Sequence, residues 1–281
     1  MPDFSANLSM LFTERPFLDR FAAAARAGFA AVEFMFPYDH AKERIADELR
    51  RHGLKLVLFN LPAGDWERGE RGIACHPDRT DEFRAGVDRA IEYAAALGCR
   101  YLNCLAGIAP EGVPGAVLRR TFVDNLRYAS ARLMEHGMRL LIEPVNTRDV
   151  PDFYLHRTAE AVSILDEVGA RNLSLQCDVY HMHRMGEPVA ETIARYLPRI
   201  AHIQIADAPG RHEPGTGEID FDTLLPFLDR IGHCGWVGCE YKPKAGTEAG
   251  LAWLTRYATK VPMPARSLFP ARTAAAIPAV A

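Results

Sequence analysis

The 281-residue sequence lacks several patterns that mark common protein classes. Its six cysteines form no Cys-x-x-Cys pair. A chain of this length does not need disulfides, so we expect free thiols in a reducing cytoplasm. No stretch approaches the roughly 20 apolar residues that cross a bilayer. The N-terminus has no basic segment followed by an apolar core, so neither a membrane partner nor a secretory signal is expected.

A basic excess is also missing, since 33 Lys and Arg stand against 36 Asp and Glu, for a net charge of -3. Nucleic-acid binders normally carry a basic excess or a basic stripe, so no nucleic-acid partner is expected. What the sequence does have is 48% hydrophobic and 25% charged residues, the proportions of an ordinary globular protein. Composition alone leaves one large domain or two small ones open.

Short β-rich apolar runs recur along the chain, and several are almost continuously apolar. Such runs are typical of strands that are covered on both faces, as in a parallel sheet. There are eight of them: Ser5–Phe12, Ala31–Phe36, Lys55–Asn60, Arg100–Gly107, Arg139–Val145, Leu173–Tyr180, Ile200–Asp207 and Trp236–Lys242.

Helical patterns separate these runs, and six of them stop at a glycine, which can adopt the left-handed conformation that ends a helix. The expected helices are Pro16–Ala27, Ala41–His52, Arg79–Leu97, Ala116–His136, Thr158–Val168, Pro188–Tyr196, Phe221–Ile231 and Gly246–Tyr257. Eight strand-helix units over about 255 residues predict a single (β/α)8 TIM barrel over residues 1–260. Residues 261–281 are rich in Ala and Pro and are predicted to be a loosely ordered tail.

A doubly wound open sheet is the main competing architecture. A dinucleotide-binding sheet of that kind usually has a Gly-x-Gly-x-x-Gly turn after its first strand, whereas Thr13-Glu14-Arg15-Pro16 follows here. Two long polar loops, 61–79 and 208–217, each follow a predicted strand. In a TIM barrel such loops lie on the face that carries the active site, where they could close over it.

Polar residues end four consecutive predicted strands, at Glu143, Asp178, Gln204 and Glu240. Each taken singly has a simpler explanation, such as a rim carboxylate paired with Arg or an amide that only supports the structure. Taken together, three buried carboxylates would repel one another unless a cation lay between them. An all-oxygen set of this charge suits Mg²⁺ or Mn²⁺, so one divalent metal ion is expected.

The segments around these residues resemble the hydroxypyruvate isomerase family of xylose-isomerase-like TIM barrels. The resemblance covers residues 5 to about 258, and its most specific part is Pro-Gly-Arg211-His-Glu-Pro-Gly-Thr-Gly-Glu218. It implies that Glu143, Asp178, Gln204 and Glu240 hold one divalent metal and that Glu143 and Glu240 exchange protons with the substrate. Related sugar epimerases often have His where Gln204 stands, which favours the hydroxypyruvate isomerase branch.

The activity that the resemblance implies interconverts hydroxypyruvate and 2-hydroxy-3-oxopropanoate (tartronate semialdehyde) through an enediolate. The substrate carries a carboxylate, for which Arg211 and Lys242 are the candidate partners. His181 follows Asp178 by three residues and is a candidate partner for a substrate oxygen. We therefore expect a small keto or hydroxy acid as the partner of a cytoplasmic enzyme, and a homo-oligomer is possible.

Three other functions stay open from the sequence. The first is isomerisation of a 2-oxo-tetronate, or isomerisation or epimerisation of a short ketose, on the same metal site. The second is an apurinic endonuclease, which shares the barrel but should show several His ligands and a basic face. The third is a sugar-acid sensor without catalysis, which would not require two glutamates close to the reacting carbons.

Overall fold

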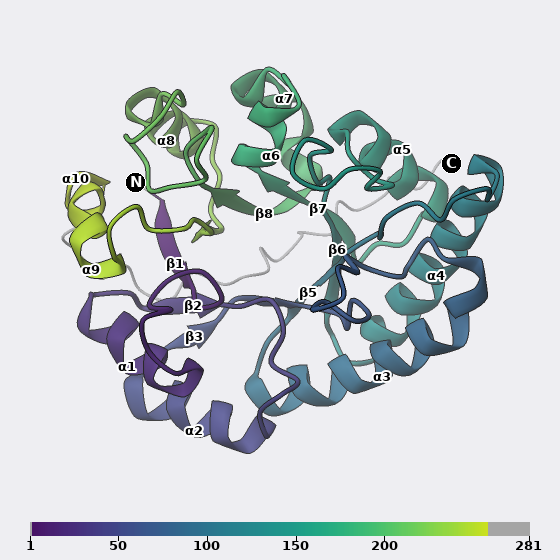
Figure 1. The fold of residues 1–281 in the computed structure, drawn as a ribbon, viewed down its shortest axis with the longest axis horizontal. Coiled ribbons are helices and arrows are strands. Elements are labelled where there is room, and N and C mark those ends of the chain that lie inside the picture. Colours follow the sequence, from purple (N-terminus) through teal and green to yellow (C-terminus); the bar gives the residue numbers. More distant parts are fainter. Residues whose placement is uncertain (1, 258–281) are drawn as a thin grey trace, which may run out of the picture.

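A computed structural model describes residues 2–257 as a ring of parallel strands surrounded by helices (Figure 1). The nine strands form one sheet that is bent into a nearly closed barrel. They are β1 (Asp3–Asn7), β2 (Ala31–Glu33), β3 (Lys55–Leu56), β4 (Leu58–Asn60), β5 (Tyr101–Cys104), β6 (Arg139–Ile142), β7 (Leu173–Asp178), β8 (Ile200–Ile205) and β9 (Trp236–Cys239).

The barrel closes between β3 and β4, which follow one another in the chain but pair with different strands. The strand order β3-β2-β1-β9-β8-β7-β6-β5-β4 begins and ends on β3 and β4, which only Val57 separates in the chain. β3 pairs with β2, whereas β4 pairs with β5. Across the gap, Val57 donates to the Val32 carbonyl at 2.9 Å and Phe34 donates to the Leu58 carbonyl at 3.3 Å. The predicted eight-stranded barrel is therefore confirmed, and the open sheet is wrong.

The helices pack outside the strands, as the alternating pattern predicts. They are α1 (Phe17–Arg26), α2 (Lys42–His52), α3 (Thr80–Leu97), α4 (Gly115–Glu135), α5 (Thr158–Val168), α6 (Val179–Arg184), α7 (Val189–Tyr196), α8 (Phe221–Arg230), α9 (Thr247–Gly250) and α10 (Leu254–Tyr257), with 3-10 turns at Pro77–Arg79, Leu197–Arg199 and Leu251–Trp253. Gly53, Gly98 and Gly169 end their helices at positive φ, which confirms the predicted stops. The expected helix at 246–257 is instead two short helices around a 3-10 turn.

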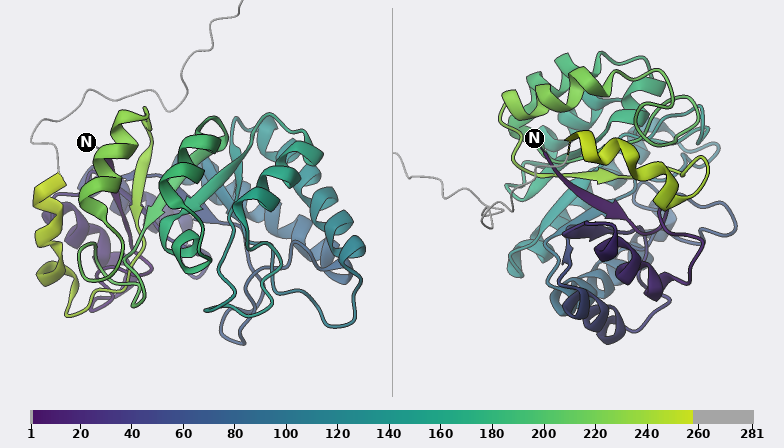
Figure 2. Two further views of the ribbon diagram at one scale, coloured as in Figure 1. Left: turned by 90° about the horizontal axis from the view of Figure 1, so that it is seen from above. Right: turned by 90° about the vertical axis from the view of Figure 1, so that its left-hand side faces the viewer.

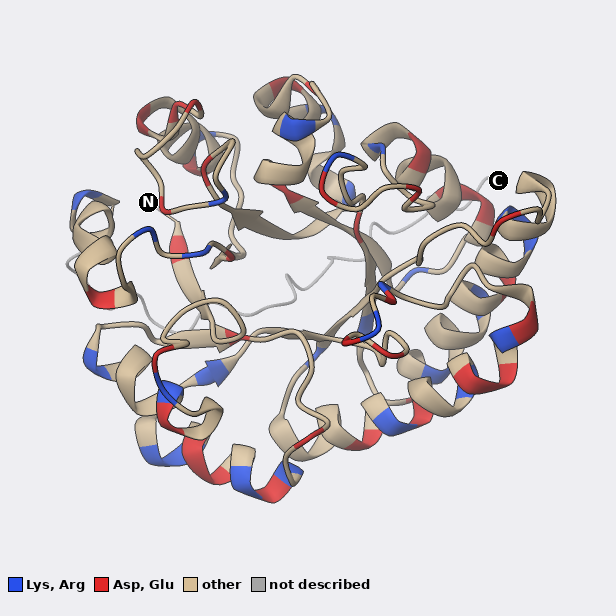
Figure 3. Ribbon diagram, viewed as in Figure 1, with Lys and Arg blue, Asp and Glu red and all other residues tan. Residues whose placement is uncertain are grey.

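The core lies between the sheet and the helix ring. Phe21, Val87, Leu126 and Ile164 come from four different helices, and all four are fully buried against the strands. The outward faces of the helices carry Lys and Arg interspersed with Asp and Glu (Figure 3). This amphipathic pattern is what fixes each helix against the barrel.

The predicted strands are shorter in the structure, apart from Lys55–Asn60, which is divided into β3 and β4, and two of them end for a clear local reason. The run Ser5–Phe12 ends as a strand at Asn7, because the Asn7 side chain accepts a hydrogen bond from the Ser9 amide and its carbonyl accepts one from Leu11. A side-chain turn of this type competes with continued strand pairing. Likewise β7 ends at Asp178, whose carboxylate caps the unpredicted helix α6 by accepting from the amides of Tyr180 and His181.

The two long loops lie where the strands end, on one side of the ring (Figure 2). In the first loop Gly72 pairs with Ala106, and in the second Asp207 pairs with His212. The Asp207 carboxylate also accepts from the amides of Gly215 and Gly217, both at 2.9 Å. The Asp207 side chain therefore anchors the backbone of the second loop.

Among residues 2–257, none of the helices combines the length and apolarity that crossing a membrane requires. The expected end of the barrel at residue 260 and the expected tail at 261–281 lie outside the described residues.

Candidate active site

The four predicted metal ligands lie together where consecutive strands end. Asp178 is the last residue of β7 and is in register with Gln204 on β8, which in turn is in register with Gly238 on β9. Glu143 and Glu240 each follow directly after a strand. All four side chains are buried, with residue exposures of 1 to 7%.

Arg211 lies between two of the carboxylates. Its guanidinium is 2.5 Å from Glu240 Oε2 and 3.3 Å from Asp178 Oδ2. It also lies over the ring of Tyr180, 5.1 Å from the centroid. The backbone of Arg211 has a φ of 55°, a conformation that non-glycine residues rarely adopt and that the surrounding structure must hold.

Burial gives the carboxyl groups of the site unusual affinities for protons. It raises the pKa of Glu143 well above the ordinary value, and the charges of Glu240 and Asp178 raise it further. Burial also raises the pKa of Asp178, although Arg211 opposes the shift. For Glu240, burial raises the pKa to about 8 against the opposing effect of Arg211. Three buried acids thus lie around one guanidinium, which contacts two of them. Negative charge therefore exceeds positive charge when all three are ionised.

Glu143 is held by amide groups alone. Its Oε2 accepts from Asn103 Nδ2 at 2.8 Å and from Gln176 Nε2 at 2.9 Å. The same nitrogen of Gln176 donates to Gln204 Oε1 at 2.7 Å. A chain of side-chain amides therefore links the Glu143 side of the site to the Gln204 and Glu240 side.

His181 has one ring nitrogen held by Asn146. Its Nδ1 faces the Asn146 side-chain amide at 2.6 Å and the Asn146 backbone amide at 3.3 Å. Both of these groups can only donate, so Nδ1 accepts and the ring proton is on Nε2. That nitrogen lies 3.5 Å from Asp178 Oδ2 and 3.9 Å from Glu143 Oε1. Burial, followed by the charge of Arg211, lowers the pKa of His181, which keeps the ring neutral.

The site can accommodate a divalent metal ion. One atom each of Glu143, Asp178 and His181 lie within 4.8 Å of one another, and all three residues are buried. The excess of carboxylates over cations is the condition that a bound cation relieves. The donor chemistry of these residues therefore fits a metal ion.

The structure places Lys242 after the end of β9, whereas the sequence predicted it to lie within that strand. β9 ends at Cys239, so the strand alternation that would align Lys242 with Glu240 does not reach it. The Lys242 side chain is exposed, and its backbone amide donates to the Arg211 carbonyl at 2.7 Å while its carbonyl contacts His212 Nδ1 at 2.7 Å. Its backbone supports the loop of Arg211, and its role as a substrate-binding residue stays a prediction.

The sequence analysis missed Glu33, at the end of β2. This carboxylate is fully buried and contacts both His202 and Gln204. The cost of burying a carboxylate in an apolar strand, which singled out the four other positions, applies equally to Val32-Glu33-Phe34. Asn7 and Gln176 were missed as well, because neither lies at the end of its predicted strand and a neutral amide alone does not signal a site.

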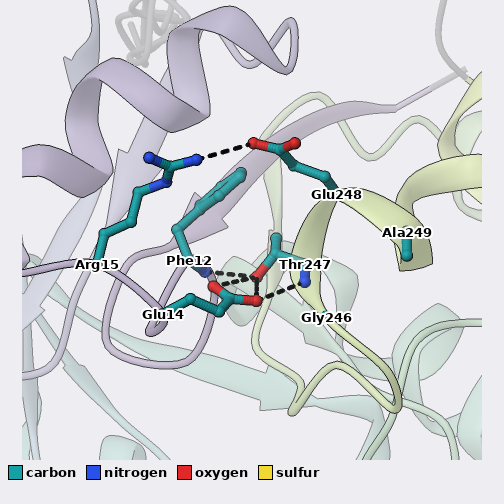
Figure 4. Close-up of a pocket in the computed structure, with 7 residues that line it drawn as sticks. All are labelled: Phe12, Glu14, Arg15, Gly246, Thr247, Glu248 and Ala249. Atoms are coloured by element: carbon teal, nitrogen blue, oxygen red, sulfur yellow. Dashed lines mark hydrogen bonds and ion pairs between the residues drawn. The ribbon is translucent and has the colours of Figure 1, made fainter.

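A separate pocket of about 420 Å³ opens beside the loop after β1 (Figure 4). Its lining residues are Phe12, Glu14, Arg15, Gly246, Thr247, Glu248 and Ala249. Thr247 Oγ1 accepts from the Phe12 amide at 2.6 Å, and Glu14 accepts from the Thr247 amide at 2.8 Å. None of the predicted site residues lines this pocket. Its contacts tie the loop after β1 to the start of α9.

Comparisons with known proteins agree with this fold. Residues 21–257 match the family described as xylose isomerase-like TIM barrel. A hydroxypyruvate isomerase from Escherichia coli is 52% identical over 90% of this chain and 98% of its own length. A 2-oxo-tetronate isomerase from Cupriavidus necator is 47% identical over 92% of this chain and 99% of its own. A crystal structure described as AP endonuclease, family 2, from Brucella melitensis is 46% identical, with a TM-score of 0.90 over 92% of this chain and 100% of its own.

The chain thus belongs to the xylose isomerase-like TIM barrels. Within them it belongs to the family of the hydroxypyruvate and 2-oxo-tetronate isomerases, and it is an isomerase.

Proposed function

We propose that the protein interconverts hydroxypyruvate and 2-hydroxy-3-oxopropanoate with the help of one divalent metal ion, Mg²⁺ or Mn²⁺. The observation that carries the proposal is the pair of buried glutamates, Glu143 and Glu240, on either side of Asp178. The 52% identity to a hydroxypyruvate isomerase supports the choice of substrate. A cytoplasmic location and a homo-oligomer stay predictions.

Glu143, Asp178, Gln204 and Glu240 are the residues that would hold the metal. When bound, the ion supplies a Lewis acid that stabilises negative charge on the substrate oxygens. His181 lies in the same cluster as Glu143 and Asp178, but while Asn146 holds its Nδ1 the ring proton is on Nε2, so that nitrogen donates rather than coordinates. We assign His181 as a hydrogen-bond donor to a substrate oxygen.

The two glutamates would move the proton between neighbouring carbons. One removes the proton from C3 of hydroxypyruvate, which leaves an enediolate, and the other returns a proton to C2, while the proton of the O3 hydroxyl passes to O2. Burial has raised the pKa values of both groups, so each can hold a proton near neutral pH. Close placement in a buried site contributes as much as basicity to a transfer of this kind.

Arg211 would bind the carboxylate of the substrate. Its planar fork suits a carboxylate, and its side chain is already within the site. An arriving substrate would compete with Glu240 and Asp178 for the guanidinium. Lys242 would contribute from the neighbouring loop after β9, where its side chain is exposed.

A 2-oxo-tetronate is the second candidate substrate, favoured by the 47% identity to an isomerase of that name. It shares the keto and carboxylate groups that the site would recognise and differs in length. A panel of hydroxypyruvate, 2-oxo-tetronates and neutral ketoses, followed by NMR, separates these possibilities. We expect the fastest turnover with hydroxypyruvate.

The deciding experiment is turnover of hydroxypyruvate by the purified protein before EDTA treatment, after it, and after Mg²⁺ or Mn²⁺ is restored. We expect activity that is lost with EDTA and regained with metal. Inactivity under all three conditions would contradict the proposed substrate. Cleavage of DNA containing an abasic site, measured in parallel, would instead support the activity named for the Brucella melitensis structure.

A further inference from the structure

Glu33 is a buried carboxylate that the proposed reaction does not use. It is fully buried at the end of β2, beneath the proposed metal ligands. An unpaired carboxylate in such a position would be very costly. Its retention there requires contacts that stabilise it, and those contacts indicate what it does.

Both oxygens of Glu33 accept hydrogen bonds. Oε2 accepts from the Ser5 hydroxyl at 2.8 Å and contacts His202 Nε2 at 2.9 Å. Oε1 accepts from Gln204 Nε2 at 2.7 Å and from Asn7 Nδ2 at 3.3 Å. Although burial raises the pKa of Glu33, the contacts with His202, Gln204 and Ser5 outweigh it, and the pKa is lowered. Both oxygens of Glu33 thus face side chains that can donate hydrogen bonds.

A glycine on β9, the strand on the far side of β1 from β2, makes room for this carboxylate. Gly238 lies beside Glu33, and a Cβ atom built on it would be 2.4 Å from Glu33 Oε1. Any side chain at position 238 would displace the carboxylate from its place. The space and the donors are thus both matched to Glu33.

The effect reaches the proposed metal site through Gln204. The Gln204 amide nitrogen faces two carboxylates, Glu33 at 2.7 Å and Glu240 at 3.4 Å. An N–H faces a carboxylate oxygen favourably, so a flip of the amide would place its oxygen against Glu33 Oε1. Its oxygen is consequently turned towards Gln176, on the Glu143 side of the site.

We propose that Glu33 is a positioning residue that fixes the orientation of the Gln204 amide, so that its oxygen and not its nitrogen is available as a metal ligand. This inference rests on the proposed metal site. Groups that orient metal ligands from behind typically change metal affinity by 10- to 100-fold when they are removed.

The test measures Mn²⁺ affinity by titration calorimetry on EDTA-treated protein, together with the melting temperature of each metal-free variant. Glu33→Met removes the acceptor at similar volume, and we expect the dissociation constant to rise about tenfold or more. Glu33→Gln should stay within about threefold of the wild type. Its carbonyl can still accept from Gln204, while its NH2 faces Ser5 and His202, which can both accept.

Ser5→Ala is the matched control, because it removes a contact from the other oxygen of Glu33 and leaves Gln204 untouched. Its Mn²⁺ affinity should be unchanged within about twofold, as expected for a group that does not contact a ligand. If Glu33→Met fails to fold, Gly238→Ala takes its place, since it displaces the carboxylate without removing the charge.

The results separate the inference from the proposed function. Equal Mn²⁺ affinity in the wild type and Glu33→Met (or Gly238→Ala) would overturn the positioning role and leave the metal site standing. Binding by Glu33→Gln as weak as by Glu33→Met would show that charge rather than orientation matters, and would overturn it too. A wild type that binds no Mn²⁺ would overturn the metal site and the inference together.

Discussion

Glu143 and Glu240 have the same side chain, the same depth and opposite surroundings. Glu143 is held by the amides of Asn103 and Gln176, which are neutral. Glu240 contacts the guanidinium of Arg211 at 2.5 Å. Burial raises the pKa of both, but the cation limits the rise at Glu240 to about 8, and no such cation contacts Glu143. The two glutamates therefore differ in their neighbours, with a cation beside Glu240 and neutral amides beside Glu143.

Because their surroundings differ, one glutamate can release a proton while the other takes one up. Pairs of acids whose surroundings separate their pKa values are typical of acid-base catalysis. The assignment of the two roles is directly testable by changing one side at a time.

The largest effect is expected from removing either glutamate. Glu143→Gln and Glu240→Gln should each lower kcat for hydroxypyruvate by about 10³-fold, within the range for loss of general acid-base catalysis. Circular dichroism checks that each variant is folded. Turnover comparable to the wild type in either variant would eliminate the two-glutamate scheme.

Replacing Arg211 removes the cation that distinguishes the surroundings of Glu240 from those of Glu143. Arg211→Met should lower kcat/KM for an acidic substrate by about 10- to 100-fold, the value of a charge-assisted hydrogen bond. A neutral ketose should be affected less, and Arg211→Lys, which keeps the charge, should retain part of the activity. An equal loss for acidic and neutral substrates would remove Arg211 as a carboxylate ligand.

Asn146 holds the ring of His181, which lies beside Glu143 and Asp178. Asn146→Leu removes the side-chain donor to His181 Nδ1, so the ring proton is no longer confined to Nε2. We expect kcat to fall roughly tenfold, as for loss of one buried hydrogen bond. The tautomer can be observed by ¹⁵N NMR of labelled histidine, where the wild type should show a proton on Nε2. A proton on Nδ1 in the wild type would refute this assignment.

Lys242 should matter less than Arg211 because its side chain is exposed. Lys242→Ala is expected to raise KM for hydroxypyruvate about threefold, the range of a solvent-exposed charge interaction. A control measurement with a neutral ketose should show no change. A rise as large as that in Arg211→Met would mean that the loop rearranges when substrate binds.

The smallest effect concerns the stability of the metal-free protein. The pKa of Glu240 is raised from 4.5 to about 8, so between these values the folded state binds a proton that the unfolded chain has released. Stability therefore falls as the pH rises from about 4.5 to about 8. The melting temperature of EDTA-treated protein should drop by a few degrees over this range. Glu240→Gln should show a smaller drop; an identical one would contradict the shift.

Much of the fold could be predicted because each helix stop and each apolar run has a local cause. The break between β3 and β4 could not, since Lys55–Asn60 is evenly apolar and the change of partner at Val57 follows from closing the ring. The end of β1 at Asn7 was missed because a side-chain turn outweighed an apolar continuation.

Three of the four predicted ligands were found because carboxylates are conspicuous in buried strands, and Gln204 because it lies near the end of the strand between two of them; the structure brings all four together. Lys242 was placed by strand alternation, which fails once β9 ends at Cys239. The amide chain through Gln176 depends on contacts between strands far apart in sequence, which no local pattern shows.

The most direct test of the two-glutamate account is hydrogen exchange in D₂O with saturating Mn²⁺, followed by NMR. With hydroxypyruvate, one of Glu143→Gln and Glu240→Gln should still exchange the C3 proton without isomerising the substrate, because its remaining glutamate is the base at that carbon. The other variant should instead exchange the C2 proton of 2-hydroxy-3-oxopropanoate. If both variants behave alike with both compounds, the two glutamates do not divide the proton transfer.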